Sequence, residues 1–256
     1  MKRSLVDRLI QFVKPTALAS FAPPPAEMAP GLWTLERRLG MSWSPSLPTS
    51  TTIIRLPSGG LLVVSPPPLK PGGLEAIDSL GTVEEIVVPN SFHYLNAAGF
   101  HERYRGATLR VVPGLRERVA AAPRGEELTR PAPPSWGTVV DLQLLGPVRG
   151  ICEAALLHRP SSTLIVTDLA FHMVRHGSGL ERAFWHLNGI PAGFGPSRTA
   201  RMLLLRDRTA TADFLRRILE WPFERVLVSH GEPLETDAVA EFRRAFADYL
   251  GQRRSG

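Results

Sequence analysis

Short runs of apolar and β-branched residues recur along the chain, and most of them end at proline or glycine. Residues 51–56 and 61–64 flank the turn sequence Pro57-Ser58-Gly59-Gly60, which predicts a β-hairpin. Residues 85–88 and 108–112 predict two buried strands, each followed by a proline. Residues 93–105 between them have helical spacing, so this strand–helix–strand unit predicts a parallel pair.

The second half of the chain continues the pattern. Residues 139–145, 153–159 and 162–166 predict three more strands. Two helices follow, one with Thr211 as its N-cap and one with Thr236, and both carry apolar residues at helical spacing. Strands, βα units, further strands and closing helices predict an α/β fold with two facing sheets and helices outside. This arrangement is a four-layer αββα sandwich.

The first 30 residues differ in composition from the rest. Residues 15–30 are rich in proline and alanine, which is typical of an extended arm. We therefore predict an N-terminal arm over residues 1–30 and one folded domain over residues 31–256. The chain of 256 residues is 43% hydrophobic, enough for a substantial core.

Residues with metal-binding chemistry follow three predicted strands, at residues 85–88, 162–166 and 226–228. The segment SFHYLNAAG, residues 91–99, resembles the metal-binding loop of the metallo-β-lactamase superfamily, whose pattern is His-x-His-x-Asp-His followed by x-Gly-Gly. His93 keeps the second histidine of that pattern. Asp168, after an apolar strand, matches the family's bridging aspartate, and His230, before Gly231, matches its last histidine ligand.

Within that superfamily the chain is similar to the domain-of-unknown-function 4336 group. The residues that carry this likeness are Val88-Pro89-Asn90 ahead of His93, residues 221–225 ahead of His230, and residues 195–198. The resemblance covers roughly residues 31–250. It implies the αββα fold and a site related to a two-metal hydrolase centre.

The resemblance also identifies ligand positions that have changed. Ser91, Leu95, Asn96 and Ile151 stand where the family has metal ligands. A catalytic zinc usually has three protein ligands, and the three retained residues, shared between two ions, leave neither ion with three. Our first hypothesis is therefore a metallo-β-lactamase fold with a degenerate metal site, no bound metal and no dinuclear hydrolase activity. Its ligand would be an unknown small molecule or protein.

The alternative is a mononuclear metal-dependent hydrolase in which His93, Asp168 and His230 share one zinc or iron ion. His172 is a candidate supplement, because it shares a face with Asp168 if a helix begins there. Each ligand candidate also has a structural interpretation: His93 bonding the backbone of its loop, Asp168 forming a turn or cap, and His230 capping its strand. Arg198, in a glycine-containing loop, is a candidate anion contact.

Composition narrows the partners and the compartment. The net charge is +6, and nearly all of the positive charge is carried by arginine. Since no basic run is interleaved with aromatic residues, nucleic acid is not an expected partner. Cys152 is the only cysteine, so no internal disulfide forms. The N-terminal segment is a poor signal peptide and too short to span a bilayer, so we expect a cytoplasmic protein without a membrane span.

Overall fold

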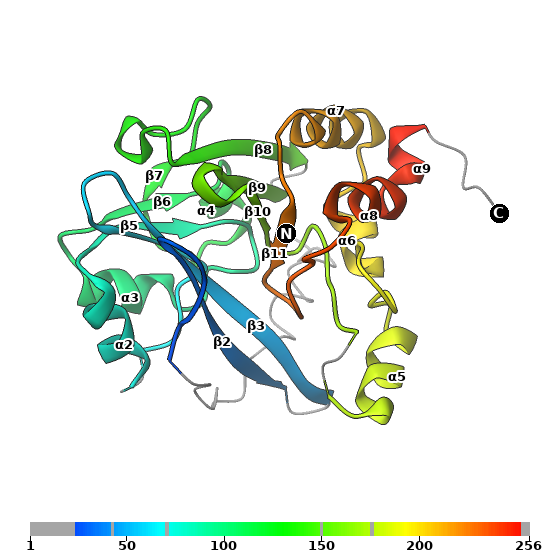
Figure 1. Cartoon of the computed structure of the whole chain (residues 1–256), viewed down its shortest axis with the longest axis horizontal. Coiled ribbons are helices and arrows are strands. Elements are labelled where there is room, and N and C mark those ends of the chain that lie inside the picture. The colour runs from blue at the N-terminus through cyan, green and yellow to red at the C-terminus, as the bar shows by residue number, and fades with distance from the viewer. Residues whose placement is uncertain (1–23, 42–43, 70–71, 149–150, 175–176, 252–256) are drawn as a thin grey trace.

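Two β-sheets form the centre of the computed structural model, which describes residues 24–41, 44–69, 72–148, 151–174 and 177–251 (Figure 1). Strands of the first sheet lie side by side in chain order: β1 (Ala26–Ala29), β2 (Leu32–Met41), β3 (Ser44–Arg55), β4 (Leu61–Val64), β5 (Val83–Val88), β6 (Thr108–Val111) and β7 (Glu126–Glu127). The second sheet has the order β11-β10-β9-β8 and consists of β8 (Val140–Val148), β9 (Ile151–His158), β10 (Thr163–Val166) and β11 (Arg225–Val228).

Helices surround the two sheets. They are α2 (Gly73–Leu80), α3 (Ala97–Arg103), α4 (Leu115–Arg118), α5 (Gly179–Leu187), α6 (Arg198–Leu203), α7 (Arg208–Leu219), α8 (Ala238–Ala245) and α9 (Ala247–Leu250), with 3-10 turns at Pro134–Trp136 and Arg159–Ser161. Figure 1 shows α2 and α3 beside the first sheet and α7 to α9 on the opposite side, beside the second. The αββα sandwich predicted from the sequence is confirmed.

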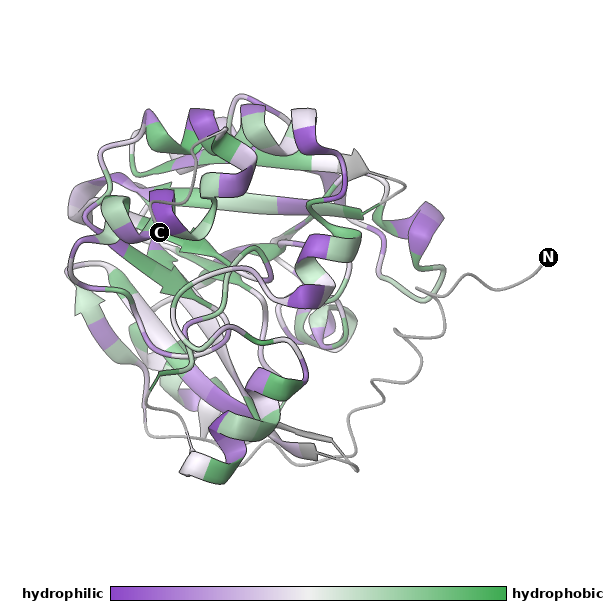
Figure 2. Ribbon diagram, turned by 90° about the vertical axis from the view of Figure 1, so that its right-hand side faces the viewer, coloured by the Kyte–Doolittle hydropathy of each residue, from purple (hydrophilic) through white to green (hydrophobic). Residues whose placement is uncertain are grey.

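Strand β9 explains why the two sheets stack. All of its residues are buried, because both of its faces are covered. Cys152, Ala154 and Leu156 belong to the core shared with the first sheet, whereas Ala155 and Leu157 pack in a second core with α7 and α8. This alternation follows from the two-residue period of a strand. In Figure 2 hydrophobic colour gathers on the inner strands, and the peripheral helices carry both colours.

Parallel strand pairs determine where a site can form. Strand β5 pairs in parallel with β4 and β6, and β10 pairs in parallel with β11. The carboxyl ends of parallel strands meet at one edge of a sheet, where α/β proteins place their sites. Ser65 follows β4, the loop with His93 follows β5, Asp168 follows β10, and His230 follows β11.

Several predicted element boundaries are wrong. Helix α3 begins at Ala97 rather than at His93, because residues 91–96 form a turn. Helix α7 is capped by Asp207, whose side chain accepts a hydrogen bond from the Ala210 amide, and not by Thr211. Both aspartate and threonine suit an N-cap, so composition alone did not distinguish them.

The ends of the chain also differ from prediction. Asp237, rather than Thr236, precedes α8. Strand β1 pairs with β2 and so makes the last part of the predicted arm a member of the first sheet. Residues 1–23 of that arm lie outside the described residues, and the division into arm and domain stays a prediction. Among the described helices, none combines the length and apolar character that a bilayer crossing requires.

Candidate metal centre

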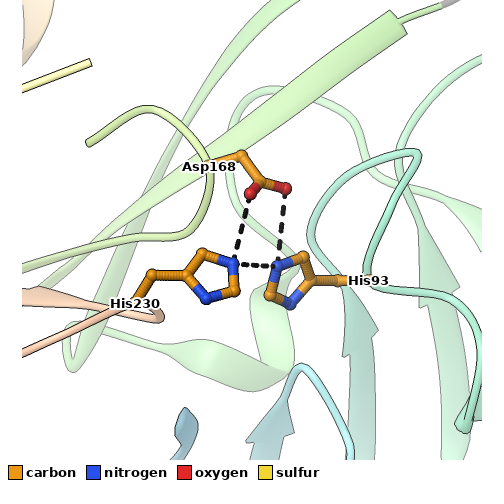
Figure 3. A group of neighbouring side chains, drawn as sticks. All are labelled: His93, Asp168 and His230. Carbon is orange, nitrogen blue, oxygen red and sulfur yellow. Dashed lines mark hydrogen bonds and ion pairs between the residues drawn. The ribbon is translucent and has the colours of Figure 1, made fainter. Parts of the chain in front are cut away.

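His93, Asp168 and His230 converge on one point at the carboxyl ends of the parallel strands (Figure 3). The Nε2 atoms of the two histidines are 3.3 Å apart. Asp168 places Oδ2 3.4 Å from His93 Nε2 and Oδ1 3.3 Å from His230 Nε2. The prediction that these three residues come together is thus correct, although all three are far apart in the sequence.

The three separations suit a shared cation better than direct hydrogen bonds. Hydrogen bonds between such atoms are normally about 2.7–3.2 Å long. A tetrahedral zinc ion with ligands at about 2.0–2.1 Å separates neighbouring ligand atoms by about 3.3–3.4 Å. Two imidazoles and one carboxylate also form a donor set that zinc and ferrous iron accept. The residues present therefore fit a single metal ion.

Hydrogen bonds of the Nδ1 atoms of His93 and His230 orient the Nε2 atoms toward the cluster. His230 Nδ1 lies 2.9 Å from the Pro48 carbonyl oxygen, which can only accept, so Nδ1 carries the proton and Nε2 carries the lone pair. His93 Nδ1 lies 2.6 Å from Ser65 Oγ, and donation to that hydroxyl gives His93 the same tautomer. Two lone pairs and a carboxylate then face one another, and a cation relieves their repulsion.

Burial and charge favour the protonation states that a metal needs. Burial lowers the pKa of His93, and this outweighs the opposing effect of Asp168. Burial acts to raise the pKa of Asp168, yet the two neighbouring histidines hold that pKa below its ordinary value. His93 is therefore neutral and Asp168 ionised at neutral pH, the forms in which both residues ligate metals.

Asn90, two residues after the end of β5, connects the loop of His93 to Asp168. Its Oδ1 accepts hydrogen bonds from the amides of Phe92 (2.8 Å) and His93 (2.9 Å). Its Nδ2 lies 2.7 Å from Asp168 Oδ2 and 2.8 Å from Glu153 Oε2. Asn90 is almost completely buried. It therefore fixes both the backbone that presents His93 and the carboxylate that faces the histidines.

Two backbone features hold the cluster in place. Ser65 has a φ of 58°, in the left-handed region that non-glycine residues rarely occupy, and its hydroxyl contacts His93. Gly231 has a φ of 116°, and a Cβ there would lie 1.9 Å from the His172 carbonyl oxygen. Only glycine permits this close approach, which explains the His230-Gly231 pair.

His172 does not supplement the cluster. Asp168 begins no helix; His172 instead forms a parallel bridge with Gly231, and its Nδ1 lies 3.0 Å from the Glu232 carbonyl oxygen. The condition on which His172 was a candidate, a helix beginning at Asp168, is not met, because this segment pairs with Gly231. Arg198, the predicted anion contact, is exposed at the start of α6.

The four changed ligand positions have different surroundings. Ile151 is buried in the second core, and Leu95 is 44% exposed. Ser91 is completely buried, while Asn96 donates from its side chain to the Pro66 carbonyl oxygen at 3.3 Å. Among the histidine, cysteine, aspartate and glutamate side chains of the described residues, His93, Asp168 and His230 form the group close enough together to hold one metal ion.

Sequence analysis missed Arg37, Asn90 and Glu153 as parts of this region. Arg37 lines a cavity of about 340 Å³ beside the cluster. Glu153 is fully buried and accepts hydrogen bonds from the Thr167 amide and hydroxyl, and its pKa is raised by burial and by Asp168. The burial of these polar residues would have identified them, but a single sequence does not reveal burial.

A family model described as domain of unknown function (DUF4336) matches residues 30–177, more than half of the chain. The chain belongs to the DUF4336 family. The resemblance stated from the sequence is thereby confirmed. The match includes His93 and Asp168, and His230 lies beyond its end. No curated protein matches this DUF4336 chain by sequence.

Solved structures with the same fold come from distant relatives. A 1–254 fragment of diflavin flavoprotein A 5 from Nostoc sp. PCC 7120 is 13% identical, with a TM-score of 0.64 over 90% of this chain and 96% of that one. The flavodiiron core Flv1 from Synechocystis sp. PCC6803 is 11% identical, with a TM-score of 0.60 over 93% and 62%. The metallo-β-lactamase FIM-1 from Pseudomonas aeruginosa, in its mono-zinc form, is 10% identical, with a TM-score of 0.59 over 93% and 99%. These likenesses confirm the metallo-β-lactamase fold of the DUF4336 chain.

Proposed function

We propose that His93, Asp168 and His230 bind one zinc or ferrous ion and that the protein is a mononuclear metal-dependent hydrolase. One observation carries the proposal: the three side chains face a common point, with 3.3 Å between the two histidine Nε2 atoms and 3.3–3.4 Å from each of these to one oxygen of the Asp168 carboxylate. This replaces our first hypothesis of a metal-free site. It keeps the expectation that the protein is not a dinuclear hydrolase, because Leu95 and Ile151 offer no donor atom.

The chain's own residues hold the donors and shape the space beside them. A metal ion bound here would polarise a substrate carbonyl and lower the pKa of water. Asn90 orients Asp168, and Ser65 and the Pro48 carbonyl orient the two imidazoles. The adjoining cavity, lined largely by apolar side chains, receives the substrate.

The structural neighbours are named for different metals, so the number and identity of the ions in this chain are left to experiment. The neighbour from Pseudomonas aeruginosa was solved in a mono-zinc form, and that from Synechocystis is a flavodiiron core. Zinc is the first choice where the reaction is hydrolysis, since it needs no redox change. A cytoplasmic location is part of the proposal and is supported by the presence of a single cysteine.

The decisive experiment is a metal titration of the full chain. Untagged protein is stripped with chelator, titrated with zinc or, anaerobically, with ferrous ion, and its metal content is measured. We expect one ion per chain, and loss of binding in His93→Ala, Asp168→Ala and His230→Ala. His172→Ala is the matched control and should still bind one ion, because His172 lies outside the cluster. A stoichiometry far below one with both metals overturns the proposal.

Hydrolysis is tested separately from metal binding. Zinc-loaded protein is assayed against an ester, a thioester and a lactam, with and without chelator. Activity that disappears on chelation and returns with one equivalent of zinc supports the hydrolase. A protein that binds one ion but turns over none of the three bond types would be a metal-dependent binding protein, and the catalytic half of the proposal would fail.

A further inference from the structure

A cavity of about 340 Å³ lies beside the metal cluster. Its volume is at the lower end of the ~300–1,000 Å³ that small-molecule sites occupy. His93, Asp168 and His230 form part of its wall, and most of the remaining wall is apolar. The larger apolar residues include Leu47, Phe92, Phe171, Trp185, Ile190 and Leu203. The space thus suits a small molecule with an apolar body.

Arg37 on β2 is the cationic side chain in this wall. It is 6% exposed, and its Nη1 donates to Thr51 Oγ1. Within the described part of the chain, Arg37 has no ion pair with a carboxylate. Burial lowers the pKa of Arg37 to about 10, so the guanidinium stays charged at neutral pH.

Arg110, another well-buried arginine, is paired with carboxylates. Arg110, on β6, lies 3.0 Å from Glu85 Oε1 through Nη2 and 2.9 Å from Glu126 Oε2 through Nη1. Buried charges in proteins are nearly always paired in this way, because an isolated ion loses its hydration without compensation. Arg37 is more deeply buried than Arg110 and has no such partner. Its missing anion is therefore expected from a molecule in the cavity.

Arg37 is connected to the metal cluster through two residues. Thr51, which accepts from Arg37, donates through its hydroxyl to the Ser65 carbonyl oxygen at 2.6 Å. Ser65 Oγ in turn lies 2.6 Å from His93 Nδ1. An anionic group bound by Arg37 would therefore lie on the side of the cavity that contains the cluster, with its adjoining atoms next to the three metal ligands.

We propose that Arg37 binds the carboxylate of an apolar organic acid whose hydrocarbon body fills the cavity. The guanidinium fork matches a carboxylate in a bidentate arrangement. This inference names the substrate class of the proposed hydrolase, and to that extent rests on the proposed function: an acid with an apolar body and a hydrolysable bond near its charged end. The binding step itself needs only Arg37 and the apolar wall.

The test compares two probes that differ only in the charged group. Octanoate and octan-1-ol are titrated calorimetrically into full-length, chelator-treated protein, so that octanoate has no metal to bind. We expect octanoate to bind at least tenfold more tightly than octan-1-ol. In Arg37→Met this preference should vanish, and Arg37→Lys should retain part of it, because the lysine keeps the charge but not the fork. Equal affinity for the two probes in the wild-type protein overturns the inference, whether or not Arg37→Met folds.

Arg38→Met provides the matched control. Arg38 is next to Arg37, is outside the cavity wall and donates to Ser46 Oγ. It should leave the octanoate preference unchanged; an equal loss in both variants would mean that only net charge matters and would overturn the inference. Zinc stoichiometry separates the two proposals. Absent zinc with intact octanoate preference refutes the metal function alone, and bound zinc without the preference refutes the acid site alone.

Discussion

Replacing Asn90 with alanine should damage the metal site without touching a ligand. Asn90→Ala removes the acceptor of the Phe92 and His93 amides, and it removes the amide that lies 2.7 Å from Asp168 Oδ2. Loss of an outer-shell partner of this kind typically costs about 10–100-fold in metal affinity. We expect the zinc dissociation constant of Asn90→Ala to rise by that factor.

The folded state should also lose stability. A neutral hydrogen bond contributes about 1 kcal/mol, and one to a charged group about 1.5–3 kcal/mol. The two backbone amides and the contact with Asp168 therefore give an expected loss of at least roughly 3–5 kcal/mol in the free energy of unfolding, to which the lost contact with Glu153 adds. The size of this loss reflects the burial of Asn90, which is 1% exposed, because water does not reach the groups left behind.

Zinc affinity is measured by competition with a chromogenic chelator, and stability by urea denaturation of the metal-free protein. Asn188→Ala is the matched control: Asn188 also lines the cavity, but its side chain is exposed and donates to the Phe184 carbonyl oxygen. It should change zinc affinity by less than about threefold, well below the second-shell effect. If Asn90→Ala binds zinc as tightly as the wild type, Asn90 does not organise the site and the reasoning is refuted.

Three other predictions concern Ser65, His158 and Cys152. Ser65→Ala and Ser65→Gly both remove the hydroxyl next to His93. In urea denaturation Ser65→Gly should be more stable than Ser65→Ala by about 1 kcal/mol, because glycine tolerates the φ of 58°. A glycine variant less stable than the alanine variant would contradict this. Burial lowers the pKa of His158 from 6.5 to about 4. The unfolded state therefore takes up a proton before the folded state as the pH falls. The free energy of unfolding of the wild type should decrease by about 2–3 kcal/mol between pH 6.5 and pH 4. In His158→Gln this decrease should be smaller by about 2–3 kcal/mol, and in the control His186→Gln it should equal that of the wild type. The same pH dependence of stability in all three proteins would be evidence against this role of His158. Burial raises the pKa of Cys152 to about 12, so Ellman's reagent should label no thiol in the native protein at pH 8 and one in urea; rapid native labelling would disprove this.

The sequence predicted the sandwich because its signals are local. Short apolar runs closed by proline or glycine specify buried strands, and two of them separated by a helical segment specify a parallel pair. The same logic placed His93, Asp168 and His230 after strand ends. Their resemblance to a known ligand pattern then indicated a common site, which the structure confirms as one cluster.

Local signals failed where several elements compete or combine. Thr211 and Asp207 are both suitable caps, and backbone geometry rather than composition decides between them. His172 would share a face with Asp168 if a helix began there, but pairing with Gly231 holds this segment in a bridge. Such pairing is invisible in a window of neighbouring residues, because its partner lies far along the chain.

What the chain determines by itself is therefore the set of elements and the chemistry at their ends, and what only the tertiary structure decides is which polar groups are buried together. Arg37 is the clearest case. It follows the buried Leu35 by two residues, so strand alternation indicates that it turns inward, but the sequence does not show that a cavity lies on that face. The pairing of β2 with β3, with Arg37 opposite Thr49, turns Arg37 to the cavity, and a shift of one residue would have placed its neighbour there.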